Sequence, residues 1–273
     1  MPFADSYERN SDDLILFPSD VRLRKEMLVN WKDAGLEGDH PAKANLYLTL
    51  ELILHTTEPG QQIMDVTAGA GSVLLGLLKG RDVVAIDIAP HFVDWMRMSV
   101  KKVGTVPKPN GVPAASLILQ GDCRDYLPLP VDSIIFSPPY AGAFNSGGGI
   151  LSRDKQLGAA VEQYRHDKNN LGNLPNFLFN RAMQEIYHKC FDSLPMGGTL
   201  SLIIKDRIKG GVRVHLGLEA VRNMIKAGFE VQEWHRWKPP GSIFVSIKRS
   251  KGETVVEDEH IIIMRKPEVS RVA

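Results

Sequence analysis

The feature that most constrains the fold is the alternation, from residue 62 onward, of short apolar runs with longer mixed segments. Short apolar runs are typical of strands buried on both faces, and helix-length segments between them connect parallel strands. The alternation therefore predicts an α/β fold with a mostly parallel sheet. The expected strands are Gln62–Val66, Asp82–Ile86, Ser116–Gln120, Ser133–Phe136, Thr199–Lys205, Val231–Trp237 and His260–Arg265.

The segments between these runs favour helices, and a largely buried helix is expected before them. The expected helices are Ala42–Thr57, Ser72–Leu78, His91–Val103, Phe177–Leu194 and Val214–Ala227. Near the end of the chain, Pro239-Pro240-Gly241 separates two strand-like runs without a helix-sized connection, which predicts an antiparallel hairpin at the sheet edge. The run Ile243–Ile247 is a candidate for one more strand.

The length of 273 residues suits a single domain with an insertion. We expect residues 1–39 to form an N-terminal extension and residues 40–273 one domain. The stretch of about 141–175 has no clear periodicity, so we interpret it as an insertion near the active site. The polar start, the two cysteines and the lack of a membrane-length apolar run favour a cytoplasmic protein that contacts no membrane.

The charges are unevenly distributed along the chain. Residues 1–180 carry a net charge of −4 and residues 181–273 a net charge of +5. A basic C-terminal third suits a polyanionic partner, and an ordinary solvated surface explains it equally well.

A glycine-rich turn carries the first chemical signal. Asp65-Val66-Thr67-Ala68-Gly69-Ala70-Gly71-Ser72 follows a strand-like run and opens a helix. Glycines let such a turn approach a ligand closely, and the helix N-terminus presents free amides. Asp87, 16 residues after Gly71, ends the next apolar run, where nucleotide-binding folds place a carboxylate on ribose hydroxyls. A purely structural turn is the alternative, and Leu74 in place of a third glycine disfavours a dehydrogenase.

Two further signals follow later strands. Gly121-Asp122-Cys123 places a carboxylate after the third strand, where it can accept from an adenine amino group or simply cap a turn.

Ser137-Pro138-Pro139-Tyr140 follows the fourth strand directly. Its two prolines fix the angles of the neighbouring oxygens, so Ser137 and the Pro138 carbonyl can accept from a base amine stacked on Tyr140. A rigid turn with a packing tyrosine is the alternative.

Together with His40-Pro41-Ala42-Lys43, which alone reads as a helix start, these motifs resemble the DNA amino-methyltransferases. That family uses S-adenosylmethionine to methylate N4 of cytosine or N6 of adenine. The resemblance covers about residues 40 to 266 and is strongest from 61 to 140. It departs at Val66-Thr67-Ala68 and at Ala70, although both glycines are kept. It implies a Rossmann-like class I methyltransferase with a mostly parallel seven-stranded sheet and an antiparallel edge hairpin.

The resemblance also implies roles for particular residues. Asp65, Gly69 and Gly71 would shape the site for the amino-acid end of S-adenosylmethionine, Asp87 would hold the ribose and Asp122 the adenine. The full set expected to bind the cofactor is His40, Lys43, Asp65, Thr67, Ala68, Gly69, Gly71, Ser72, Asp87, Ile88, Asp122 and Cys123. The catalytic set is Ser137, Pro138, Pro139 and Tyr140, acting on a flipped base by positioning without a covalent nucleophile.

Serine at the first tetrapeptide position favours N4-cytosine over N6-adenine within this family. Methylation at carbon-5 of cytosine is excluded, because that chemistry needs a cysteine after a proline in this loop. Substrate contacts are expected from two regions. In the insertion they come from Asn145, Arg153, Arg165 and Lys168. Around the Lys205–Gly211 loop and the Trp234–Lys238 run they come from Lys205, Arg207, Trp237 and Lys238. Tryptophan is more often a core residue than a contact, which is the alternative for Trp234 and Trp237.

The expected partner is double-stranded DNA, in a prokaryotic or phage-like context. Whether a restriction nuclease accompanies the chain in a restriction–modification system stays open. The histidines and cysteines show no metal-ligand spacing, so no catalytic metal is expected. The alternatives left open are an RNA base, a protein glutamine amide, and a non-catalytic module that binds cofactor or nucleic acid.

Overall fold

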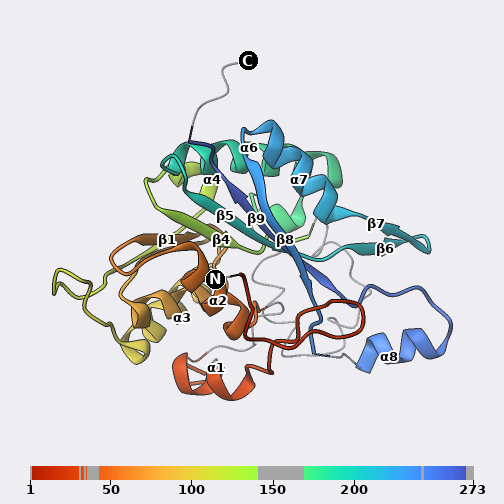
Figure 1. The fold of residues 1–273 in the computed structure, drawn as a ribbon, viewed down its shortest axis with the longest axis horizontal. Coiled ribbons are helices and arrows are strands. Elements are labelled where there is room, and N and C mark those ends of the chain that lie inside the picture. The colour runs from red at the N-terminus through yellow and green to blue at the C-terminus, as the bar shows by residue number, and fades with distance from the viewer. Residues whose placement is uncertain are drawn as a thin grey trace.

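The computed structural model describes residues 2–30, 32–33, 35, 43–140, 169–240 and 243–268. Its central feature is a seven-stranded sheet with the strand order β3-β2-β1-β4-β5-β9-β8 (Figure 1). The strands are β1 (Gln62–Asp65), β2 (Asp82–Asp87), β3 (Ser116–Gln120), β4 (Ser133–Phe136), β5 (Thr199–Ile204), β8 (Glu230–Trp237) and β9 (Glu259–Arg265). β1 to β5 pair in parallel, and β9 runs antiparallel to both β5 and β8. This arrangement confirms the predicted Rossmann-like fold, with its mostly parallel seven-stranded sheet and antiparallel edge.

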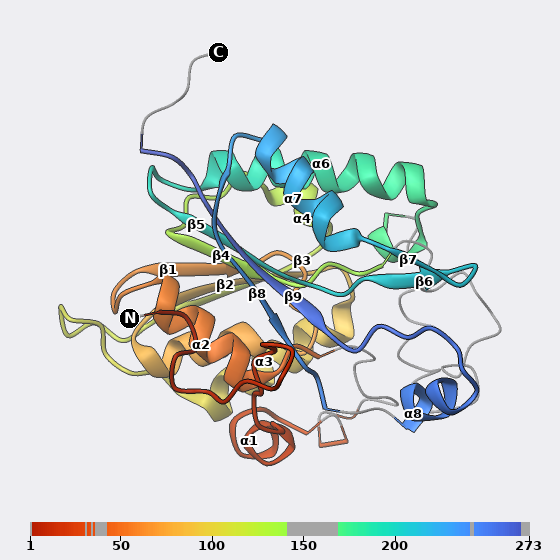
Figure 2. The ribbon, with the colours of Figure 1, turned by 45° about the vertical axis from the view of Figure 1, so that its right-hand side comes forward.

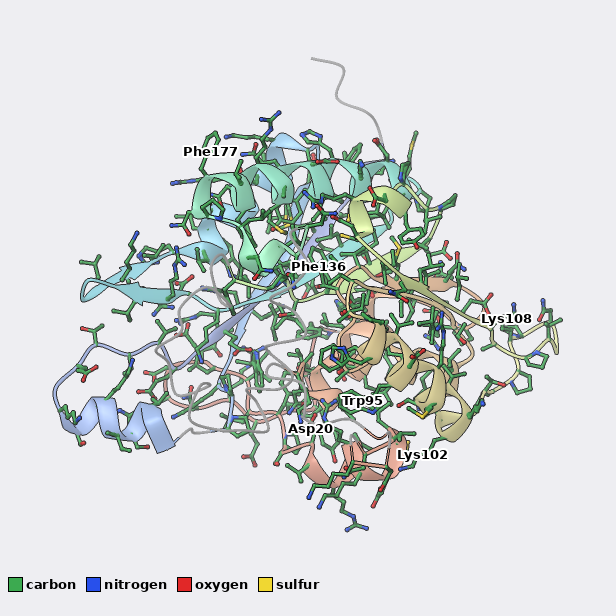
Figure 3. All side chains as sticks on the ribbon, turned by 180° about the vertical axis from the view of Figure 1, so that it is seen from behind. Asp20, Trp95, Lys102, Lys108, Phe136 and Phe177 are labelled. Carbon is green, nitrogen blue, oxygen red and sulfur yellow. The ribbon has the colours of Figure 1, made fainter. Side chains whose placement is uncertain are left out.

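Helices cover both faces of the sheet (Figure 2). One layer contains α2 (Leu46–Thr56), the 3₁₀ helix η1 (Ser72–Lys79) and α3 (Pro90–Val103), and the other contains α4 (Cys123–Tyr126), α6 (Asn176–Ser193) and α7 (Leu216–Lys226). Successive strand residues serve opposite layers, as the pleat requires: Ile63 lies in the first core and Met64 in the second. Figure 3 shows Phe136 of the second core near the middle of the molecule.

The N-terminal residues are part of the first core. Phe3, Ile15 and Phe17 are buried in it, and the Ile15 N–H donates to the Arg236 carbonyl of the edge strand β8. Helix α1 (Val21–Met27) follows and packs near α3. The indole N–H of Trp95 on α3 donates to the Val29 carbonyl at 2.7 Å, which ties this segment to the helical layer. Among the described residues, no helix combines the length and the apolar character needed to span a bilayer.

The expected strands agree with the structure to within one residue at each end, and two other expectations are wrong. The segment expected as a Lys205–Gly211 loop contains strand β6 (Arg207–Lys209), which pairs with β7 (Val212–Val214). Gly210 (φ 57°) and Gly211 (φ 78°) make the two-residue turn, because a hairpin of this length needs positive φ at both positions. Val214 therefore belongs to a strand, and α7 begins at Leu216.

The extra strand expected at Ile243–Ile247 is also wrong. These residues form α8 (Ile243–Ser250), which stands apart from the sheet within the connection between β8 and β9 (Figure 1). β-branched residues favour a strand only where a neighbouring strand is available for pairing. Since this segment pairs with none of the described strands, its backbone groups are satisfied within a helix. The antiparallel pairing of β8 and β9 was correctly predicted, but their connection contains a helix.

Candidate active site

A cavity of about 490 Å³ opens at the carboxyl ends of β1 to β5, where ligands of open α/β sheets bind. We call it the central cleft. The residues predicted to form the site that line it are Lys43, Asp65, Thr67, Ala68, Gly69, Ser72, Asp87, Ile88, Asp122, Cys123, Ser137, Pro138, Pro139, Tyr140, Lys205 and Trp237. Gly71, Arg207 and Lys238 do not line it, and His40, Asn145, Arg153, Arg165 and Lys168 lie outside the described residues.

The glycine loop is held by the carboxylate that ends β2. Asp87 accepts from the Gly69 N–H at 2.8 Å and from the Ala89 N–H at 2.9 Å, and it is only 5% exposed. Gly69 has a φ of 48°, which a glycine adopts without steric cost. An ionised carboxylate has about four acceptor positions, so Asp87 can hold the loop and still accept from a ligand hydroxyl.

Gly71, which was predicted to shape the cofactor site, has a packing role and does not itself line the cleft. Its φ is 74°, and a Cβ atom there would lie 2.9 Å from Met96 Cγ and 3.0 Å from Leu74 Cδ1. This position therefore needs glycine so that the start of η1 can approach α3 closely.

Asp65 ends β1 and turns its carboxyl back onto the loop. Oδ1 accepts from the Thr67 N–H at 2.9 Å. Burial raises the pKa of Asp65 to about 7, although the hydrogen bond from Thr67 acts in the opposite direction. A carboxyl group with this pKa changes charge near neutral pH, and such groups are concentrated at functional sites.

Asp122 caps the short helix α4 and also lines the cleft. Oδ1 accepts from the Arg124 N–H at 2.9 Å, and the Arg124 Nε lies 3.0 Å from both carboxylate oxygens. The cap that the sequence offered as the alternative is therefore present, and Arg124 fixes the orientation of the carboxylate. Cys123 is buried, which raises the pKa of its thiol to about 12, so it is held as an unreactive thiol.

The Ser137–Tyr140 turn is anchored on both sides. The Thr67 hydroxyl donates to the Ser137 carbonyl at 3.1 Å, and the Lys205 N–H donates to the Tyr140 hydroxyl at 3.0 Å. Burial raises the pKa of Tyr140, so the phenol stays protonated. The glycine loop and the end of β5 therefore fix the turn between them, and all four of its residues line the cleft.

Glu259 was not predicted. Because β9 is reversed, its first residue lies at the carboxyl edge of the other strands and lines the cleft. Burial raises the pKa of Glu259, although Lys205, with Nζ 3.9 Å from Oε1, acts against this rise. The sequence contained a signal for this position, since the last strand was expected to begin at His260, one residue after Glu259, and to be part of an antiparallel hairpin. Asn170 and Leu171, at the end of the expected insertion, also line the cleft.

The predicted contacts from the C-terminal third have different positions. Trp237 lines the cleft but is 4% exposed and packs against Phe17 with ring centroids 5.9 Å apart, so the core alternative is correct for most of its surface. Lys238 is exposed, and its N–H donates to the Ile15 carbonyl. Trp234 is 40% exposed and donates to His260 Nδ1. The described residues hold no group of three His, Cys, Asp or Glu side chains suited to a metal ion.

Comparison with known proteins finds no family model and no curated protein that matches the chain. Among solved structures, it is similar to TrmN from Thermus thermophilus, with 13% identity, coverage of 83% of this chain and 50% of TrmN, and a TM-score of 0.48. It is also similar to a SAM-dependent methyltransferase from Methanosarcina mazei (14% identity, 79% and 97% coverage, TM-score 0.48). A putative RNA methyltransferase from Pyrococcus horikoshii shows the same likeness (15% identity, 84% and 86% coverage, TM-score 0.49). The chain spans half the length of TrmN. These similarities concern the fold, and the strand order establishes independently that the fold is Rossmann-like.

Proposed function

We propose that the protein transfers the methyl group of S-adenosylmethionine to an exocyclic amine of a flipped nucleic-acid base, with N4 of cytosine in double-stranded DNA as the favoured acceptor. The observation that carries the proposal is the anchored Ser137–Tyr140 turn, which faces the central cleft beside the glycine loop. If the turn served only to connect elements of the fold, its oxygens and its aromatic ring would not need to lie at the wall of a cavity.

The cleft suits the proposed cofactor. Its volume of about 490 Å³ is within the roughly 300–1,000 Å³ typical of ligand pockets. Its walls supply the Asp87 carboxylate for ribose hydroxyls, Asp122 for an amino group and Asp65 for a positively charged ammonium group. When bound, S-adenosylmethionine supplies an electrophilic methyl group on a sulfonium sulfur.

The remaining work falls to residues of the turn. Ser137 and the Pro138 carbonyl would each accept a hydrogen bond from one N–H group of the acceptor amine. These two hydrogen bonds would hold the lone pair of the amine nitrogen toward the cleft. Tyr140 would support the flat face of the base. Holding two reactants in line lowers the barrier because their freedom of motion has already been lost on binding. The proton of the methylated amine passes to solvent or to a nearby carboxylate such as Glu259.

Transfer to mixed-sequence DNA and, separately, to RNA tests the proposal directly. Both are incubated with labelled S-adenosylmethionine, digested, and their nucleosides separated by mass spectrometry. Label in N4-methylcytosine from DNA supports the proposal in full, and label in N6-methyladenine would change the base. The RNA arm is included because similar structures are described as RNA methyltransferases, and label confined to RNA would change the polymer. No transfer to either polymer would contradict the proposal.

Two substitutions at Tyr140 separate its ring from its hydroxyl. Tyr140→Ala removes both, and we expect turnover to fall about 100-fold while the cofactor dissociation constant, from calorimetry, changes less than about threefold. Tyr140→Phe keeps the ring and loses only the bond from the Lys205 N–H, so its loss of turnover should be about tenfold or less. Equal loss of cofactor binding and turnover in Tyr140→Ala would contradict the assignment of the ring to the base.

A further inference from the structure

A second cavity, of about 270 Å³, lies on the other side of the Pro138-Pro139-Tyr140 segment. Its walls come from α6, α7, the β6–β7 hairpin and the end of β5. Pro138, Pro139 and Tyr140 line both this cavity and the central cleft, whereas Ser137 lines only the cleft. The Pro138–Tyr140 segment is therefore a wall that the two cavities share.

Arg207 places an unsatisfied donor at this cavity. Its Nη2 donates to Asn176 Oδ1 at 3.0 Å, which fixes the guanidinium group. Its Nε is buried and has no hydrogen-bond partner among the described residues. A buried donor without a partner is costly. The donor is closed off from the cavity, so a ligand oxygen can satisfy it only when the guanidinium group shifts on ligand binding.

The rest of the cavity combines apolar walls with amide groups. Phe179 and Met183 of α6 provide apolar surface. Asn180 Nδ2 donates to Glu219 Oε1 at 2.6 Å, and Asn223 Oδ1 accepts from Gln184 Nε2 at 3.2 Å. Each of these amides is thereby oriented and has a further donor or acceptor of its own. Lys209 adds an exposed cation at the rim.

We propose that the second cavity binds the nucleotide next to the one that is methylated. This inference rests on the proposed function, because the acceptor base in the cleft brings its neighbour to the shared wall. Apolar walls suit a base, oriented amides suit its edge, and the Arg207 guanidinium group with Lys209 suits a phosphate or base oxygen. The cavity would then set a short sequence preference without a separate recognition domain.

The first test changes the substrate. Double-stranded oligonucleotides with one target base carry, in the target strand, an abasic site immediately 5′ of the target, immediately 3′ of it, or several positions away. We expect one of the two adjacent abasic sites to lower kcat/KM at least tenfold, and the distant one to have no effect. Equal kcat/KM for all of these substrates would overturn the inference while leaving the proposed function intact.

The second test changes the protein. Arg207→Gln removes the buried Nε donor, and Arg97→Gln is the matched control. Arg97 lies on the exposed surface of α3, in the layer opposite α6 and α7 (Figure 2). Figure 3 shows the two layers well apart, with Phe177 marking α6 and Lys102 marking α3. We expect Arg207→Gln to lower kcat/KM about tenfold on the intact substrate and less than threefold on the sensitive abasic one. The cofactor dissociation constant should be unchanged in both variants.

An equilibrium measurement makes the result independent of turnover. A fluorescent double-stranded oligonucleotide is titrated with wild type, Arg207→Gln, Arg97→Gln and Asn223→Ala, and binding is followed by anisotropy. We expect Arg207→Gln and Asn223→Ala each to raise the dissociation constant about five- to tenfold relative to the control. If all four proteins bind equally, the second site is overturned, whether or not methyl transfer occurs. If Arg207→Gln and Asn223→Ala weaken binding in this way but wild type transfers no methyl group, the proposed function fails and the second cavity stands only as a nucleotide-binding site.

Discussion

Two carboxylates that follow strand ends are held differently: backbone N–H groups hold Asp87 on the glycine-loop side, whereas an arginine side chain and one backbone N–H hold Asp206 on the β5–β9 side. Asp87 accepts hydrogen bonds from the backbone N–H groups of Gly69 in the glycine loop and of Ala89 just after β2. Asp206, which follows β5, accepts from Arg213 Nε at 2.8 Å and from the Gly217 N–H at 3.1 Å. Arg213 in turn contacts Asp258 at 3.2 Å, which connects the β6–β7 hairpin to the segment before β9.

The difference shows how each side is organised. Burial alone would raise the pKa of Asp206, but hydrogen bonds from Arg213, Gly217 and His260 hold it below its ordinary value. The β5–β9 side thus depends on long side chains that can repack, whereas the glycine-loop side depends on backbone geometry that few substitutions preserve. We expect substitutions on the glycine-loop side to act on cofactor binding and stability, and those on the β5–β9 side to act on methyl transfer.

The largest expected effect is that of Asp87→Ala. It leaves the Gly69 and Ala89 N–H groups without their partner in a buried site, at a cost of about 2 kcal/mol each in the free energy of unfolding. Cofactor affinity should fall at least 100-fold. Denaturant unfolding and calorimetric titration measure the two effects. Asp94→Ala, at an exposed position on α3, should change neither; a mild effect of Asp87→Ala would show that the loop does not depend on this carboxylate.

The next effect is a dependence of stability on pH that arises from Asp65. Its pKa is about 7 in the folded protein and about 3.9 when unfolded, so the folded state binds the proton more tightly between those values. The free energy of unfolding should therefore fall as pH rises from about 4 to 7, by up to about 1.4 kcal/mol per pH unit. Asp65→Asn should remove that part of the slope in unfolding curves across this range. An unchanged slope in the variant would mean that other groups are responsible.

Gly217→Ala addresses the β5–β9 side. A Cβ atom there would lie 2.5 Å from His260 Cδ2, and overpacking of this kind costs about 2 kcal/mol. His260 follows Glu259, so the displacement should slow methyl transfer about tenfold while the cofactor dissociation constant stays within about twofold. Leu218→Ala, at the neighbouring exposed position, is the control. If Gly217→Ala weakened cofactor binding as much as methyl transfer, the β5–β9 side and the glycine-loop side would not have separate effects on the two steps.

The smallest expected effect is that of Thr67→Val, which keeps the side-chain shape and removes the hydroxyl that joins the glycine loop to the Ser137–Tyr140 turn. Losing its bond to the Ser137 carbonyl should cost about 1 kcal/mol, equivalent to about a fivefold fall in turnover. Cofactor affinity should be nearly unchanged. Single-turnover kinetics measures the step directly, with Thr254→Val at an exposed position as the control. Unchanged turnover would show that Lys205 alone positions the turn.

Much of the fold and of the cleft could be predicted from local patterns. Strand boundaries follow from apolar runs, because burial on both faces requires them. The glycine loop, Asp87 and the Ser137–Tyr140 turn each follow a strand end closely, so parallel pairing brings them to one edge. The sequence did not reveal that Gly71 serves packing, since Met96 belongs to α3, which only folding brings next to it.

What the sequence alone determined is the order of the elements and the chemistry at each strand end, because both depend on residues close together along the chain. Only the tertiary structure decided which distant groups meet. Ile243–Ile247 becomes a helix because it pairs with no described strand, and Glu259 reaches the cleft because β9 is reversed. The second cavity likewise exists only where α6, α7 and the β6–β7 hairpin converge. Contacts between segments far apart in sequence depend on packing, which local patterns do not encode.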